Sequence, residues 1–118
     1  MELKSVIWTV GIQCRPEDED KFNRWYDEVH VPMLLQGGCV AKVTRYRLAS
    51  KTYDVALTAM KCPEYQTVYE FESEEKFEAW MNGKERSAAG KDKSETWSEK
   101  PYDVIWASRY DVMGIWKA

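Results

Sequence analysis

The chain has 118 residues, which suits one domain with a single hydrophobic core. Its 17 basic and 20 acidic residues are interspersed and give a net charge of -3, so the sequence offers no basic stripe for binding nucleic acid. No apolar run reaches membrane-spanning length, and the first residues lack the apolar core and cleavage site of a signal peptide, so we expect a cytoplasmic protein that does not bind a membrane.

A strand and a helix are predicted at the start of the chain. Residues 4–14 alternate and are rich in Val, Ile and Trp, as strands are. Pro16 suits the first turn of a helix, and the acidic residues 17–20 suit the positive end of the helix dipole. One apolar face of this helix has the spacing i, i+3, i+4 and i+7, formed by Phe22, Trp25, Tyr26 and Val29.

The end of that helix is predicted near His30, which is the only histidine in the sequence. Pro32 disfavours helical geometry at the preceding residue, Val31, so the helix should stop there. The loop that follows contains Gly37 and Gly38, and glycine adopts the positive φ angles of a tight turn at no steric cost.

Two further strands are predicted in the middle of the chain. Residues 40–50 place alternate side chains on opposite faces, with Lys42, Thr44 and Tyr46 on one side and Val43, Arg45 and Arg47 on the other. Residues 64–73 form the next strand, whose shared face carries Tyr65, Thr67, Tyr69 and Phe71. The segment 51–63 between them is compatible with a long hairpin or with a continuation of the strands.

A second helix and a last strand complete the pattern. Ser73 is a suitable N-cap, Glu74 and Glu75 suit the first turn, and the inner stripe consists of Phe77, Trp80 and Met81. Helical sequence continues after this stripe with a break predicted near Gly90, and residues 102–116 form the last strand.

The order β-α-β-β-α-β predicts a single α+β domain over residues 1–118 with a ferredoxin-like fold. The pattern Lys-Phe-x-x-Trp occurs in both predicted helices, at 21–25 and 76–80, which supports two related halves. Such a fold has a four-stranded antiparallel sheet with both helices on one face. Because both faces of these strands carry large apolar residues, we expect a homodimer that covers the other face.

The three cysteines, Cys14, Cys39 and Cys62, are widely spaced and form no C-x-x-C pair. With one histidine besides, they make neither a disulfide framework nor a zinc site, so we expect no bound metal. Cys39 follows two glycines and is close to His30 in sequence, which leaves a thiol nucleophile as a minor alternative.

The segment FNRWYDEVHVPMLL resembles the W-Y-x-x-H-x-P-M helix end of the EthD-like family, within the dimeric α+β barrel superfamily, with three residues in this chain between Tyr26 and His30. YEFESEEKFEAW is similar to the third strand and second helix of that family, and AAGKDKSETW to its D-x-x-x-x-W stretch. For Asp92 and Trp97, which match that stretch, we expect a structural role in preference to a catalytic one. The resemblance implies a homodimer whose sheets close into a barrel, with a cavity between helices and sheet. The wider superfamily includes cofactor-free monooxygenases, isomerases, cyclases and haem-degrading enzymes, and fold alone does not choose among them.

His30 is the candidate catalytic residue, at the edge of the apolar stripe of the first helix. A helix C-terminus and Asp27 favour the imidazolium, whereas burial against Trp25 and Tyr26 favours the neutral ring. In a dry cavity desolvation should dominate and leave a neutral imidazole able to accept a proton. Tyr46 or Tyr69 would then donate a hydrogen bond to a developing enolate, and Arg45 or Arg47 would hold a carboxylate.

These residues favour a small cofactor-independent enzyme that acts on an aromatic or lactone-like metabolite as an isomerase, cyclase or monooxygenase. His30 would be the base, and Trp25, Tyr26, Tyr46 and Tyr69 would bind the substrate. One alternative is a non-catalytic dimer that binds a small apolar ligand or scaffolds another enzyme. Another is haem binding with His30 as the axial ligand.

Overall fold

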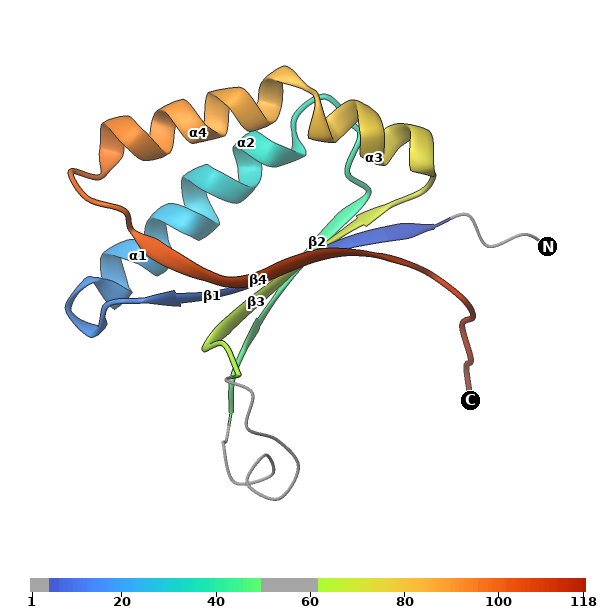
Figure 1. The fold of residues 1–118 in the computed structure, drawn as a ribbon, viewed down its shortest axis with the longest axis horizontal. Helices are drawn as coiled ribbons and strands as arrows, with labels where there is room; N and C mark the ends of the chain where they lie inside the picture. Colours follow the sequence, from blue (N-terminus) through green and yellow to red (C-terminus); the bar gives the residue numbers. More distant parts are fainter. Residues whose placement is uncertain (1–4, 50–61) are drawn as a thin grey trace.

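The computed structural model describes residues 5–49 and 62–118, so the predicted hairpin or strand continuation at 51–63 lies almost entirely outside the described residues. Four strands form one antiparallel sheet in the order β2-β3-β1-β4. They are β1 (Val6–Cys14), β2 (Lys42–Arg47), β3 (Tyr65–Phe71) and β4 (Tyr102–Asp111). All the helices lie on one face of this sheet, which gives the two layers of a ferredoxin-like α+β fold, as predicted (Figure 1).

The first helical segment continues past His30, so the predicted helix end was wrong. It begins with a 3-10 turn (Pro16–Asp18) and α1 (Glu19–Trp25), passes through a π-helical turn (Tyr26–His30) and ends with α2 (Val31–Leu35). The Val31 N–H donates to the Tyr26 carbonyl, five residues back. A proline inside an α-helix clashes with the carbonyl four residues before it. The wider π turn accommodates Pro32 in the first turn of α2, so the helix need not stop.

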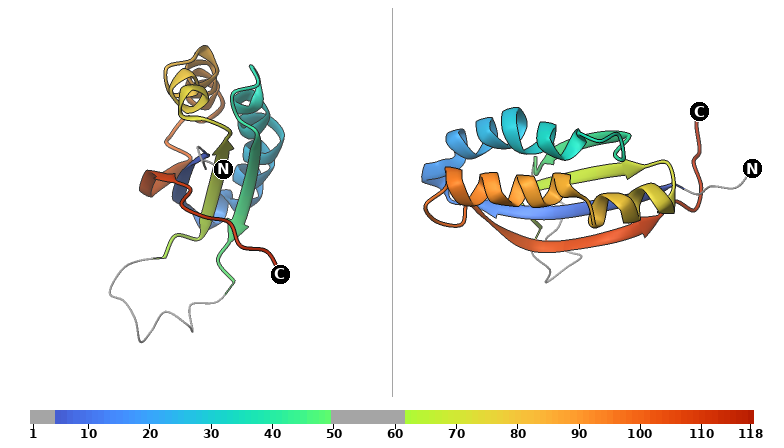
Figure 2. Two further views of the ribbon diagram at one scale, coloured as in Figure 1. Left: turned by 90° about the vertical axis from the view of Figure 1, so that its right-hand side faces the viewer. Right: turned by 90° about the horizontal axis from the view of Figure 1, so that it is seen from above.

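The second helical segment is interrupted at Gly83 and not at Gly90. α3 (Glu74–Met81) ends at Asn82, and α4 (Lys84–Thr96) starts after Gly83, whose extended backbone (φ -86°, ψ 164°) turns the chain. Gly90 lies inside α4. Figure 2 shows the two helical segments running side by side above the sheet.

The loop after α2 turns at Gly37 and Gly38, which have φ angles of 88° and 75°. The sequence-based expectation of positive φ at these two glycines is therefore confirmed. An L side chain adopts such angles only with strain, which explains why glycine stands at both positions.

The sheet buries one face against the helices. In β3 the predicted apolar face is confirmed, since the buried residues are Tyr65, Thr67, Tyr69 and Phe71. The core forms two clusters, one around Phe71, Phe77 and Trp80 and the other around Ile12, Phe22 and Trp25. Residues from each of the two clusters border the space between them.

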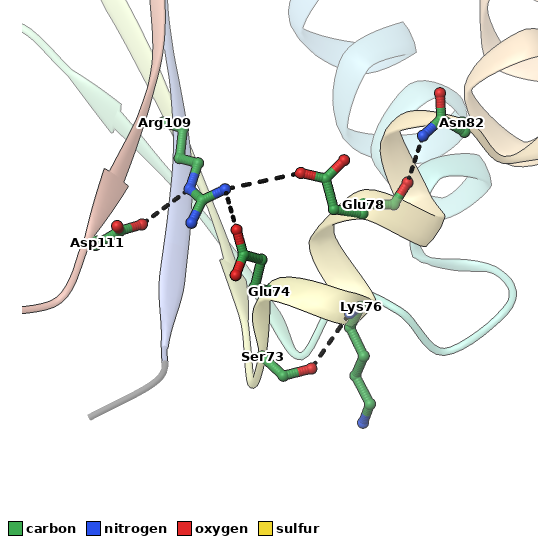
Figure 3. Close-up of polar contacts among 7 residues, drawn as sticks. All are labelled: Ser73, Glu74, Lys76, Glu78, Asn82, Arg109 and Asp111. Atoms are coloured by element: carbon green, nitrogen blue, oxygen red, sulfur yellow. Dashed lines mark hydrogen bonds and ion pairs between the residues drawn. The ribbon is translucent and has the colours of Figure 1, made fainter. Parts of the chain in front are cut away.

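The last strand stops at Asp111, five residues before the predicted end, and its outer part is joined to α3 by Arg109. The Arg109 guanidinium pairs with Asp111 at 2.8 Å and with Glu74 at 3.2 Å (Figure 3). After the strand the Val112 N–H continues the pairing by donating to the Ser5 carbonyl at 3.0 Å.

The cap of α3 predicts a measurable contribution to stability. The Ser73 hydroxyl accepts a hydrogen bond from the Lys76 N–H at 3.2 Å (Figure 3). Ser73→Ala should lower the free energy of unfolding by about 1 kcal/mol, measured by urea denaturation, because the N-terminal N–H loses its partner. Ser87→Ala, at an exposed position inside α4, is the control and should leave stability unchanged or slightly raised. Equal effects of the two changes would contradict the capping role.

Candidate functional site

A cavity of about 290 Å³ lies between the helices and the sheet. Its lining includes Tyr26 and His30 from the π turn, Tyr69 and Tyr102 from the sheet, and Arg86 and Lys93 from α4. The cavity is bordered by residues of both core clusters, because the apolar side chains of the two clusters do not close over the space between them.

The π turn places His30 in this cavity. The imidazole is 8% exposed, and its ring centroid lies 4.8 Å from those of Trp25 and Tyr26. Its Nδ1 atom is buried and has no hydrogen-bond partner among the residues that the structure describes. The ring is therefore held by packing against aromatic neighbours.

Burial lowers the pKa of His30 to about 4, and the nearby cations Lys93 and Arg45 lower it as well. The carboxylate of Asp92 acts in the opposite direction and raises the pKa, but it does not compensate. The imidazole is neutral at pH 7, in agreement with the expectation that desolvation dominates. The stabilisation of imidazolium expected from a helix C-terminus is missing, because the helix continues beyond His30.

Three phenols, those of Tyr26, Tyr69 and Tyr102, line the cavity together with the imidazole. Thr67 Oγ1 donates to the Tyr26 hydroxyl at 3.1 Å, and the Tyr26 and Tyr69 hydroxyl oxygens are 3.4 Å apart. Burial raises the pKa of Tyr69 and of Tyr102 well above the usual value for tyrosine. Both phenols stay protonated at pH 7 and are able to donate hydrogen bonds into the cavity.

The structure brings together only some of the predicted site residues. His30, Tyr26 and Tyr69 line the cavity. Trp25 lies behind them, packed on the imidazole, with its indole N–H donating to Asp92 at 2.9 Å. Tyr46 is not among the lining residues: it is 55% exposed, because strand alternation places it on the face opposite its neighbour Arg45.

The other sequence candidates have structural partners. Arg45 lies on the helix side, but it pairs with Asp27 at 2.7 Å and its guanidinium covers the Tyr26 ring at 4.4 Å. Asp92 accepts hydrogen bonds from Trp25 and Thr96, and Trp97 packs edge-on against Trp25. Cys39 packs against the cluster around Trp80 and is not among the cavity-lining residues.

Sequence reasoning missed three of the lining residues that carry a charge or a phenol, namely Arg86, Lys93 and Tyr102. Tyr102 faces the cavity after a register shift between Gly11 and Ile12, where β1 pairs with β4, and a sequence pattern does not reveal such a bulge. Arg86 and Lys93 could have been found from the sequence, because a spacing of seven residues places both side chains on one face of a helix. The predicted helix break near Gly90 hid that spacing.

Three properties of the described residues bear on the binding of a metal ion, of haem and of a membrane. No group of three or more His, Cys, Asp and Glu side chains within residues 5–49 and 62–118 is placed to hold a metal ion. A cavity of about 290 Å³ lined by cations and phenols fits a small planar molecule better than a porphyrin. In the same part of the chain, every helix is too short or too polar to cross a bilayer.

Solved structures share this fold at low sequence identity. An EthD family protein from Bacillus halodurans C-125 has a TM-score of 0.63 and 16% identity, over 92% of this chain and 99% of that one. SnoaB, a cofactor-independent oxygenase from Streptomyces nogalater, has a TM-score of 0.66 and 7% identity, over 95% and 96%. A dimeric protein of unknown function and ferredoxin-like fold from Bacteroides fragilis NCTC 9343 has a TM-score of 0.60 and 13% identity, over 92% and 97%.

The resemblance to EthD-like proteins is thus confirmed at the level of the fold. No curated protein sequence matches this chain significantly. The family described as "Domain of unknown function (DUF4286)" matches residues 5–101, which include β1, all the helices, and the strands β2 and β3. With most of its length matched, the chain belongs to the DUF4286 family.

Proposed function

We propose that this protein is a small cofactor-independent enzyme that uses His30 as a general base on an aromatic or lactone-like metabolite. The observation that supports this proposal most is a neutral imidazole, with a pKa of about 4, facing a cavity walled by protonated phenols. A base in its deprotonated form and hydrogen-bond donors within one partly dry site are the groups that enolisation requires.

In the proposed reaction the substrate loses a proton from an acidic carbon or a phenol to His30. Since Nδ1 is buried, Nε2 is the nitrogen assigned as the acceptor. Tyr69 or Tyr102 donates a hydrogen bond to the oxygen on which negative charge develops. Return of the proton to another atom gives isomerisation, attack of the enolate on an internal carbonyl gives cyclisation, and reaction with oxygen gives oxygenation.

The low pKa of His30 limits the substrates. A base with a pKa of about 4 is weak, so the proton it removes must come from an activated position such as a carbon between a carbonyl and an aromatic ring. The shared fold of SnoaB, a cofactor-independent oxygenase, is compatible with this chemistry, although folds of this kind host many activities.

We also propose that the protein is a homodimer joined through the sheet face that the helices leave uncovered. Val68 of β3 lies on this face between its partners Thr44 of β2 and Thr9 of β1, with Tyr46 and Tyr110 exposed near the edges (55% and 56%). The Trp106 ring lies over Gly11 on the same face, where an added Cβ would approach it to 2.8 Å. Apolar surface of this kind favours association, and a relative in fold from Bacteroides fragilis is described as dimeric.

Proton abstraction is testable with phenylpyruvate, an aromatic carbon acid. In deuterium oxide the enzyme should speed the exchange of the benzylic protons, followed by proton NMR. His30→Ala should slow the catalysed exchange about a hundredfold or more, because the base is gone. Lys91→Met, an exposed change on α4, is the control and should keep the wild-type rate. Equal rates for His30→Ala and the wild type would refute the role of His30, and binding without exchange would favour the non-catalytic alternative.

The pKa of His30 predicts a pH dependence of stability. The unfolded chain binds the proton with a pKa near about 6.5 and the folded chain with a pKa of about 4, so between these values the unfolded state carries more protons. Lowering the pH from 7 to 4 should therefore remove up to about 3 kcal/mol of unfolding free energy through this residue. His30→Gln should show a shallower loss in parallel urea titrations. Identical pH profiles would mean that the imidazole is solvated in the folded state.

The dimer is tested by the mass in solution. Val68→Asp should shift light scattering from the mass of a dimer to that of a monomer, because it buries a carboxylate in the proposed interface. Val29→Asp, at a helix position that is 36% exposed, should leave the dimer intact. A wild-type protein with the mass of a monomer at micromolar concentration would disprove the proposed assembly.

A further inference from the structure

The charged residues that line the cavity are all positive. Among its lining residues Arg86 and Lys93 are cationic, and none is an aspartate or glutamate. Neither cation forms an ion pair with a carboxylate within the described part of the chain; Arg86 Nη1 donates at 3.3 Å to the Met81 carbonyl and to the Met81 sulfur. Both side chains are half-buried. An anion that enters the cavity would interact with two cations, and no existing ion pair would have to be broken first.

One face of α4 carries these cations. Arg86, Ala89, Gly90 and Lys93 stand at i, i+3, i+4 and i+7, and all four line the cavity. A Cβ added to Gly90 would meet no atom within 4 Å, so open space lies over the middle of this face. The two cations therefore flank a gap wide enough for part of a ligand.

The cations are also positioned by aromatic rings. The Arg86 guanidinium carbon lies 5.2 Å from the centroid of the Trp80 ring, and the Lys93 Nζ lies 5.2 Å from that of Tyr102. These contacts hold each charge near the apolar wall, where Trp8 and Tyr69 provide surface for a planar ring.

We propose that the cavity binds a small planar molecule that carries a carboxylate, with Arg86 and Lys93 holding the carboxylate and the aromatic wall packing against the ring. This inference rests on the proposed function for the catalytic use of the site. It goes further by specifying that the substrate carries a negative charge. Arg86 offers a planar set of donors that matches a carboxylate, and Lys93 adds a second charge on the side of His30.

A bound carboxylate would also act on His30. Lys93 lowers the pKa of the imidazole, and a negative charge placed beside Lys93 would offset that influence. The base would then gain strength only when its substrate is present. A rise in the His30 pKa on ligand binding is thus a secondary readout, observable by NMR because the chain has a single histidine.

The test compares 2-naphthoate with 2-naphthamide, which have nearly the same shape but differ in charge. Isothermal titration calorimetry on the full chain should give a dissociation constant about tenfold lower for the naphthoate. Arg86→Met and Lys93→Met should each weaken naphthoate binding about tenfold and leave naphthamide binding nearly unchanged. Lys91→Met, an exposed cation on the same helix that is not among the lining residues, should have the wild-type preference.

The preference for naphthoate over naphthamide can be measured independently of catalysis. His30→Ala should keep the preference for naphthoate, so a loss of exchange activity in that variant with intact binding separates the proposed base from the proposed anion site. Gly90→Leu should weaken both ligands by filling the gap, which places them in this cavity. Equal binding of the two ligands, binding of neither, or an equal effect of Lys91→Met and Lys93→Met would overturn the proposal.

Discussion

The site depends on the packing of one uncharged imidazole among aromatic rings. Trp25 and Tyr26 hold His30 at a centroid distance of 4.8 Å each, and this burial, more than any hydrogen bond, keeps the ring neutral. The same rings belong to the core, so the stability of the first helical segment and the state of the base have a common origin. A change that loosens this packing would admit water and return the imidazole to ordinary basicity.

The cavity exists because the helices differ in the size of the side chains that they direct at the sheet. α3 covers the sheet with Phe77 and Trp80, and α1 covers it with Phe22 and Trp25. Between them α4 presents the small residues Ala89 and Gly90 to the sheet, and only Ala89 on this helix is buried. The apolar contacts needed for folding are made at the two ends, which leaves the centre available for binding.

Much of this architecture could be predicted from local patterns, since strand alternation, the apolar faces of β3 and α3, and the Ser73 cap all report on near neighbours in sequence. The errors have a common physical origin. The rule that proline ends a helix does not anticipate a π turn, which lets the helix continue past Pro32. The rule that glycine breaks a helix does not anticipate Gly90, which lies inside α4 beside open space. The site was predicted in part: His30, Tyr26 and Tyr69 meet, whereas Tyr46 faces away and Tyr102 depends on a bulge.

The π turn has a consequence for how chains of this fold are compared. A turn closed by an i to i+5 bond uses one residue more than a turn of α-helix, so it changes the direction of every side chain that follows. A chain with the same number of residues between Phe22 and His30 but a regular α-helix would rotate the histidine by about 100°. Loss of one residue together with the π turn would instead keep the direction of the ring. An alignment that matches the histidine and proline must therefore consider both the residue count back to the aromatic pair and the presence of the π turn, because the two together decide where the ring points.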